Sequence, residues 1–282
     1  MMRKCIFCKK NLDETQFNAE HIILNSLGGC GSKDIISTVC TSCNSKLGSS
    51  VDAFFVNHPV AEYQRNHYHI KGRNGVPNYL KNEVIQYANT PIKGNLLMNQ
   101  DGYLSGFRAN FGMLKLDNNN ILVYAPKKNA EKYAKSIMKK YNLTYMKEIK
   151  LGTPKLPHID NVTITEDGKT DYLMHAFPLM LKMAYEFCST KLGDDYINDA
   201  YAESIREYLV EFPKIDIIPA DALLNWGNNI DNKISIKLLS ENNKLYADIR
   251  ILGLAFGRIC VSINANKYKL QDDYLLEIDV TN

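Results

Sequence analysis

Two Cys-x-x-Cys pairs near the N-terminus constrain the fold more than any other feature of this chain. Cys5 is paired with Cys8 and Cys40 with Cys43, and 31 residues lie between the two pairs. Two residues between ligands allow a tight turn to direct both thiolates at one ion, so each pair can form one edge of a tetrahedron around Zn²⁺. Four thiolates close the coordination shell, which predicts a structural zinc site. Two redox pairs or four free cysteines are the alternatives, and the paired spacing favours zinc.

The composition predicts a soluble, cytoplasmic protein without a membrane partner. The hydrophobic fraction is 45% and the charged fraction 23%, as in ordinary globular proteins. The sequence has no apolar run of the roughly 18 residues that a membrane span needs, and its N-terminus lacks the apolar part of a signal peptide. A reducing compartment favours metal binding over disulfides. Cys188 and Cys260 are expected to be buried apolar residues, and Cys30 is isolated.

The pattern along the chain predicts an α+β fold with antiparallel strands. We expect a zinc module at residues 1–60, a basic connection at 61–82 and a larger mixed α+β domain at 83–282. Within that domain, residues 83–126 are expected to be mostly extended, and strands are expected again from residue 233 onward, with a hairpin turn at Glu241–Lys244. Apolar residues at helical spacing predict helices over 129–141, 171–191 and 196–211.

The residues between the cysteine pairs predict a second, chemically active site. Glu20 and His21 lie in a predicted strand over 16–24, a glycine-rich loop follows, and a second strand is expected over 35–39. A helix is predicted over 41–56, with Asn44 in its first turn facing the first strand. Glu20 and Asn44 could then both offer oxygens to one hard cation, and His21 could face a water molecule beside that cation.

This stretch resembles the HNH endonuclease family, which has the ββα-metal fold. The resemblance rests on the segments "EHI", "SLGG" and C-x-x-C-N-x-x-L-G, followed by Asp52, and covers residues 5–52. It implies that His21 is the general base, that Glu20 is a ligand of the catalytic cation, and that Asn44 is the final motif position and the second ligand. The family often has a central Asn that braces the loop, whereas this chain reads "KDIIS" there. Asp34 or backbone groups would brace the loop instead.

The chemistry of these residues agrees with the activity that the resemblance implies. Hydrolysis of a phosphodiester needs an activated water molecule and a cation that neutralises the charge developing on the phosphate. A neutral imidazole is a suitable base near pH 7. Two oxygen ligands leave most of the coordination shell open, which suits Mg²⁺ or Mn²⁺. The expected cofactors are therefore a structural Zn²⁺ and a catalytic Mg²⁺ or Mn²⁺, and the expected substrate is DNA, with RNA not excluded.

The net charge of +3 is too small to predict nucleic-acid binding by itself, so the distribution of charge matters more. Arg65, Lys71 and Arg73 follow the cysteine-rich segment and are the candidates for contacts with backbone phosphates. A lysine stripe over 128–139 could also lie along nucleic acid, although a charged helix face is usually only a solvated one.

Three interpretations of the whole chain stay open. The leading one is a metal-dependent nuclease, in which residues 83–282 serve substrate binding, regulation or formation of a homodimer. In the second, the C-terminal domain gates the nuclease, as in anti-phage effectors, and this rests on analogy alone. In the third, a zinc module without catalytic activity binds nucleic acid or protein. The Glu20, His21 and Asn44 set distinguishes the third from the others, because a binding module needs no base beside a cation site.

Overall fold

A computed structural model of the chain divides into two compact units. The first unit combines Met1–Val76 with Ile164–Asn282, and the second is Pro77–Thr163. The described residues are 2–29, 34–72, 75–87, 90–99, 104–115, 121–125, 129–143, 164–214, 220–227, 231–268, 270 and 274–281. Every strand pair among them is antiparallel, as the sequence predicts.

The first unit begins with short strands and a broken helix. Strands β1 (Met2–Lys4) and β2 (Asn11–Asp13) form a hairpin, and the 3-10 turn η1 (Glu14–Gln16) leads to β3 (Glu20–His21). A second 3-10 turn, η2 (Asn25–Leu27), precedes β4 (Ile35–Ile36), which pairs with β3. The strands are shorter than predicted, but the strand, loop, strand and helix order is confirmed.

The predicted helix over 41–56 is present and contains one wider turn. It consists of α1 (Thr41–Leu47), the π-helical turn η3 (Gly48–Asp52) and α2 (Ala53–Val56). Leu47, Val51 and Phe55 are buried, whereas Phe54 is exposed, so the apolar face follows the helical spacing of the sequence. Helix α3 (Pro59–His67) follows directly and buries Glu62, Gln64 and Asn66.

A long helix from the C-terminal part of the chain lies at the centre of this unit. Helix α5 (Glu166–Leu192) begins five residues before the predicted start at 171, because Thr165 caps its N-terminus by accepting a bond from the Gly168 amide. The predicted helix over 196–211 is divided into α6 (Asp194–Ile197) and α7 (Ala200–Glu211). Asp199 caps α7 through the amide of Tyr201 at 2.8 Å.

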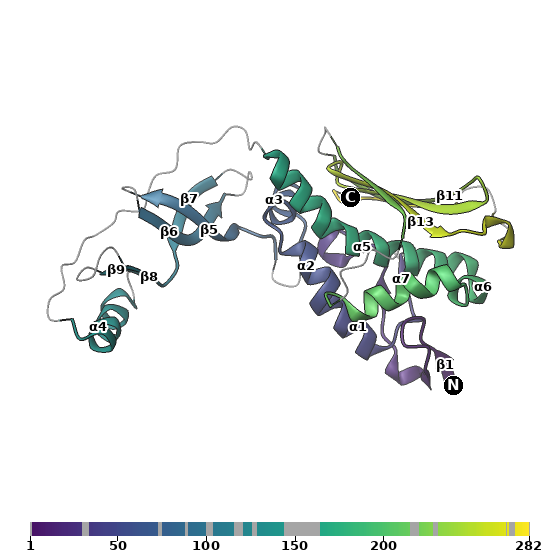
Figure 1. Ribbon diagram of the computed structural model, residues 1–282, viewed down its shortest axis with the longest axis horizontal. Coiled ribbons are helices and arrows are strands. Elements are labelled where there is room, and N and C mark those ends of the chain that lie inside the picture. The colour runs from purple at the N-terminus through teal and green to yellow at the C-terminus, as the bar shows by residue number, and fades with distance from the viewer. Residues whose placement is uncertain are drawn as a thin grey trace. The chain divides into compact units, whose positions relative to one another are not determined.

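The C-terminal sheet covers one side of α5 (Figure 1). Its order is β10-β13-β12-β11-β14, and the 3-10 turn η5 (Ala265–Lys267) lies between β13 and β14. The predicted hairpin turn is confirmed, because Asn242 and Asn243 have φ of 51° and 61°, as a two-residue type I′ turn requires. The strands are β10 (Ala222–Trp226), β11 (Lys233–Glu241), β12 (Lys244–Ile251), β13 (Ala255–Ser262) and β14 (Leu275–Asp279).

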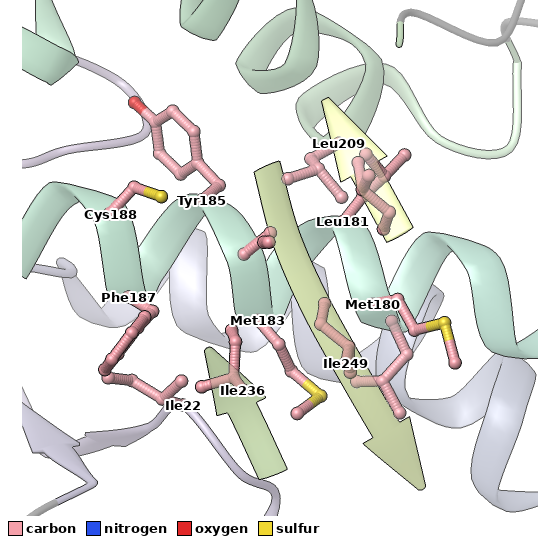
Figure 2. Packing of buried hydrophobic residues seen from close by; sticks show 14 of the residues in the cluster. Ile22, Met180, Leu181, Met183, Tyr185, Phe187, Cys188, Leu209, Ile236 and Ile249 are labelled. Atoms are coloured by element: carbon pink, nitrogen blue, oxygen red, sulfur yellow. The ribbon is translucent and has the colours of Figure 1, made fainter. Parts of the chain in front are cut away.

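One hydrophobic core joins the N-terminal segment, α5 and the C-terminal sheet. Figure 2 shows α5 side chains such as Met183 together with Ile22 of the N-terminal segment and Ile236 and Ile249 of the sheet. The two units therefore divide after Val76 and before Ile164, and not at the expected limits at 60 and 82. The expected connection at 61–82 begins as helix α3, and the expected C-terminal domain is shared between both units.

The second unit is a small α+β unit of its own. Its strands are β5 (Tyr79–Tyr87), β6 (Thr90–Met98), β7 (Leu104–Ala109), β8 (Gly112–Lys115) and β9 (Ile121–Tyr124). The predicted extended region and the predicted helix, α4 (Ala130–Tyr141), are both present. Among the described residues of both units, none of the helices combines the length and apolar character that crossing a membrane requires.

Candidate zinc centre and active site

The four cysteines of the two pairs meet at one point of the first unit. One sulfur from each of Cys5, Cys8, Cys40 and Cys43 lies within 4.8 Å of the others. The sulfurs of Cys8 and Cys40 are 3.9 Å apart, and zinc–sulfur bonds of about 2.3 Å place two sulfurs of a tetrahedron about 3.8 Å apart. None of these cysteines forms a disulfide. The donor set and its spacing therefore fit zinc, and the cluster is a zinc-binding site as predicted.

Backbone amides help to position both cysteine pairs. The amide of Lys9 donates to the carbonyl of Cys5 at 2.9 Å, and Lys9 has a φ of 56°. Cys40 is the N-cap of α1, and its amide donates to the sulfur of Cys5 at 3.4 Å. A bond from the Cys43 thiol lowers the pKa of Cys5 to about 4. A thiolate at the centre of the cluster is the form that a metal binds.

Helices α5 and α7 contact the turn that carries Cys5 and Cys8, which we call the first cysteine turn. The hydroxyl of Tyr185 on α5 donates to the carbonyl of Ile6 at 2.8 Å, and both residues are buried. The guanidinium of Arg206 on α7 donates to the carbonyl of Phe7 at 2.6 Å. Glu203, also on α7, forms an ion pair with Lys9. These contacts fix the first cysteine turn to the rest of the first unit.

The glycine-rich loop after β3 brings Asp34 to the strand pair. Gly28 has a φ of 96°, a left-handed conformation that glycine adopts without strain. A Cβ atom on Gly29 would lie 1.7 Å from the carbonyl oxygen of Ile23 and 2.7 Å from the carboxylate of Asp34. Only glycine allows this close approach. The "SLGG" segment therefore lies tightly against the backbone at Ile23, with the carboxylate of Asp34 beside it.

His21 is partly exposed, and the buried side chain of Asp34 lies next to its ring. Nδ1 of His21 is 3.5 Å from Oδ2 of Asp34, which is within ion-pair distance but is not a hydrogen bond. The His21 side chain is 23% exposed, whereas that of Asp34 is 1% exposed. Neither carboxylate oxygen of Asp34 has a hydrogen-bond partner among the described residues. The two side chains are therefore close enough for an electrostatic interaction.

Asn44 faces the first strand, as predicted. Its side-chain amide donates to Oδ1 of Asn18 at 3.1 Å and to the carbonyl of Ala19 at 3.3 Å. These bonds fix the first turn of α1 against the residues that directly precede Glu20. Because the amide nitrogen makes both bonds, the Oδ1 oxygen of Asn44 remains available as a ligand.

Glu20 is buried and lies beside an unexpected partner. Its Oε1 accepts a bond of 2.5 Å from the ammonium group of Lys182, which comes from α5 and has no exposed surface. Asp52 and Glu186 also face this ammonium group, at 3.3 and 3.6 Å. Burial opposes the charge of Lys182, but the three carboxylates outweigh it and raise its pKa. Burial raises the pKa of Asp52 and of Glu186, and Lys182 counteracts part of this effect.

Glu20 and Asn44 each keep one side-chain oxygen of the kind that a hard divalent cation binds. Glu20 bonds Lys182 through one oxygen, so the second is left for a ligand, and Asn44 retains its Oδ1. Carboxylate and amide oxygens are the ligands that Mg²⁺ prefers. Lys182 and Glu186 were missed in the sequence, where 171–191 was predicted only as an apolar helix. The signal was available, because a Lys and a Glu four residues apart interrupt the run "LKMAYEF" and must be paired if that helix is buried.

The structure separates the three basic residues that were predicted to contact phosphates. Arg65 is 9% exposed, and burial lowers its pKa, so its charge is not presented at the surface. We therefore remove it from the candidate phosphate contacts. Lys71 is exposed, and Arg73 lies outside the described residues. Lys132, Lys135 and Lys139 are exposed on α4 in the second unit.

A second polar cluster consists of His58, Asp171 and His175. Nδ1 of His58 accepts a bond from the amide of Val60 at 3.2 Å, so the ring proton lies on Nε2, which faces Asp171 at 3.0 Å. Burial lowers the pKa of His58, although the bond to Asp171 opposes this. In this tautomer the one ring lone pair of His58, on Nδ1, already accepts the bond from the Val60 amide and is not free for a metal ion. The cluster therefore acts as a helix cap.

Comparisons with known proteins address the N-terminal module. Residues 5–60 match the family model of the HNH endonucleases. The match includes the four cysteines and the Glu20, His21 and Asn44 set. Searches with the chain found no match among curated proteins or solved structures. The geometry and the family match agree, so residues 5–60 form an HNH module with a four-cysteine zinc-binding site.

Proposed function

We propose that this protein is a metal-dependent endonuclease that hydrolyses phosphodiester bonds in DNA. The observation that carries the proposal is the placement of His21 in the HNH module, with a buried carboxylate behind Nδ1 and part of its ring exposed. A zinc module that only binds nucleic acid has no use for such an arrangement. A cleavage assay with both nucleic acids tests whether RNA is the substrate instead.

His21 acts as the general base in this proposal. Nε2 takes a proton from the attacking water molecule, and the ring becomes positively charged as it does so. Asp34, 3.5 Å from Nδ1, favours the tautomer with the proton on Nδ1 and stabilises the charged ring. Backbone groups support the alternative brace of the loop, since the amide of Ile22 donates to the carbonyl of Asp34 at 2.8 Å, whereas the Asp34 carboxylate makes no hydrogen bond among the described residues.

Glu20 and Asn44 hold the catalytic cation. When bound, Mg²⁺ or Mn²⁺ neutralises charge on the phosphate and on the leaving oxygen. Glu20 contributes a carboxylate oxygen from β3, and Asn44 contributes its Oδ1 from the first turn of α1. The bonds from the Asn44 amide to Asn18 and Ala19 keep the two elements together. Zinc has a separate, structural role, because four thiolates leave no position for substrate.

A cleavage assay tests the proposal. Purified protein is incubated with supercoiled plasmid or with RNA in Mg²⁺, Mn²⁺ or EDTA, and His21→Ala is compared with His67→Ala, a change at an exposed histidine on α3. We expect cation-dependent DNA cleavage that His21→Ala lowers by about 10²–10⁴-fold, with zinc content and melting temperature unchanged. His67→Ala should cleave normally. Cleavage by His21→Ala at the wild-type rate would make the zinc module without catalytic activity the better interpretation.

The ligand variants separate the two roles. Glu20→Gln and Asn44→Ala weaken the cation site, so a higher concentration of Mg²⁺ or Mn²⁺ should partly restore cleavage. The same excess should not restore His21→Ala, because that variant lacks a base and retains both ligands. If excess cation restores all three variants equally, His21 is not the base that this division of roles requires.

A further inference from the structure

The buried ammonium group of Lys182 is the feature that the proposed mechanism does not yet use. Lys182 lies on α5, 162 residues after Glu20 and outside the segment that matches the HNH family. Its side chain has no exposed surface, and its neighbours on the helix, such as Leu181 and Met183, are apolar core residues. A methionine or leucine would fill this position without the cost of removing a charge from water.

The contacts of Lys182 indicate what the charge does. Its shortest contact is the 2.5 Å bond to Oε1 of Glu20, and the contacts to Asp52 and Glu186 are longer, at 3.3 and 3.6 Å. Glu20 is itself nearly buried, so it has little water to solvate or orient its carboxylate. Lys182 is therefore the cation that lies against this buried carboxylate.

We propose that Lys182 is a positioning residue for Glu20: it binds Oε1 and thereby leaves the other carboxylate oxygen directed at the catalytic cation. This inference rests on the proposed function. Helix α5 is packed between the C-terminal sheet and the HNH module, so it supplies a rigid support for the contact. The HNH module thus depends on a side chain from the far end of the sequence.

Groups that orient a metal ligand typically change metal affinity by about 10–100-fold when they are removed. Lys182→Met keeps the length and apolar stem of the side chain and removes the charge. Glu186→Gln is the matched control, because it alters the same buried cluster and the same helix but leaves the bond between Lys182 and Glu20. Both are compared in the full chain with its zinc bound.

The experiment measures binding of Mn²⁺ in the absence of DNA. Electron paramagnetic resonance detects the free Mn²⁺ ion at each concentration. We expect the dissociation constant for Mn²⁺ to rise about 10–100-fold in Lys182→Met and to change little in Glu186→Gln. In a chain that already carries Glu20→Gln, adding Lys182→Met should have no further effect on binding. This last result is specific for action through Glu20, because a general loss of structure would weaken binding in both backgrounds.

Unchanged Mn²⁺ binding in Lys182→Met, or an equal further loss in the Glu20→Gln chain, overturns the proposal. If Lys182→Met does not fold, Lys182→Met/Glu186→Gln replaces it, since that variant removes one buried acid together with the ammonium group. The proposed function fails separately, when the wild-type chain neither binds Mn²⁺ nor cleaves nucleic acid. A wild-type chain that does both, with Lys182→Met unaffected, refutes only the role of Lys182.

Discussion

Replacing Asp34 by asparagine should lower the activity of the module without lowering its stability. The carboxylate of Asp34 is buried and has no hydrogen-bond partner among the described residues, so it contributes little to folding and costs desolvation. Asparagine has the same shape without the charge. We therefore expect Asp34→Asn to melt at the wild-type temperature or above it, while its cleavage rate falls.

The size of the loss follows from the contact with His21. A unit charge 3.5 Å from the charged ring contributes between about 1 kcal/mol at the dielectric constant of water and about 5 kcal/mol at an effective value of about 20. Each 1.36 kcal/mol corresponds to a factor of about ten in rate. Because the His21 ring is partly exposed, solvent screening places the expected loss near the middle of this range, at about 10²-fold.

Single-turnover cleavage of plasmid at saturating Mg²⁺ measures this loss, and differential scanning calorimetry measures the stability. Asp13→Asn is the matched control, because it makes the same chemical change at the exposed N-cap of η1, where asparagine is an equally good cap. The half-saturating concentration of Mg²⁺ should stay constant in Asp34→Asn, since no cation ligand changes. Cleavage at the wild-type rate by a folded Asp34→Asn would refute the assistance of His21 by Asp34.

Three further predictions concern zinc, the core and the substrate. Native protein should contain about one Zn²⁺ per chain, and Cys40→Ser should lose it and melt at a lower temperature; metal analysis without zinc contradicts this. Tyr185→Phe leaves the carbonyl of Ile6 without its hydrogen bond. The loss of stability of about 1–3 kcal/mol should lower the melting temperature by about 2–10 °C. Tyr141→Phe, a change at an exposed tyrosine, should leave the melting temperature unchanged. Lys71→Gln should weaken DNA binding evenly across sequences and reduce the salt slope by about one, so an unchanged slope excludes a phosphate contact there.

The local features of the module could be predicted from the sequence. Cysteine spacing indicated the zinc site, and the helical spacing of Leu47, Val51 and Phe55 indicated the helix that carries Asn44. Each of these signals lies in residues close together in the chain, within one cysteine pair or along one helix. The paired asparagines of the β11–β12 hairpin are a further case, because two positive φ angles select the residues of such a turn.

Features that depend on distant residues could not be predicted in the same way. The basic character of 61–82 suggested a connection, yet Arg65 is buried on α3 because this helix shares the core of the first unit. Likewise, a Lys–Glu pair in an apolar helix predicts buried partners but does not identify them. Which carboxylates meet Lys182 depends on how α5 packs against β3 and η3, and local periodicity contains no information on that packing.

The residues that support the proposed site are therefore not confined to the segment that matches the family. Residues 5–60 contain the four cysteines and the proposed base and cation ligands, but four of the groups that contact this module come from later in the chain. Tyr185 and Arg206 bond the carbonyls of the first cysteine turn, Glu203 pairs with Lys9, and Lys182 pairs with Glu20. A carboxylate buried at a cation site needs a fixed environment, since the solvent that would otherwise orient it is absent. In this chain Lys182 of α5 contacts Glu20, and α5 and α7 together hold the first cysteine turn, which makes the C-terminal part of the first unit a structural component of the HNH module.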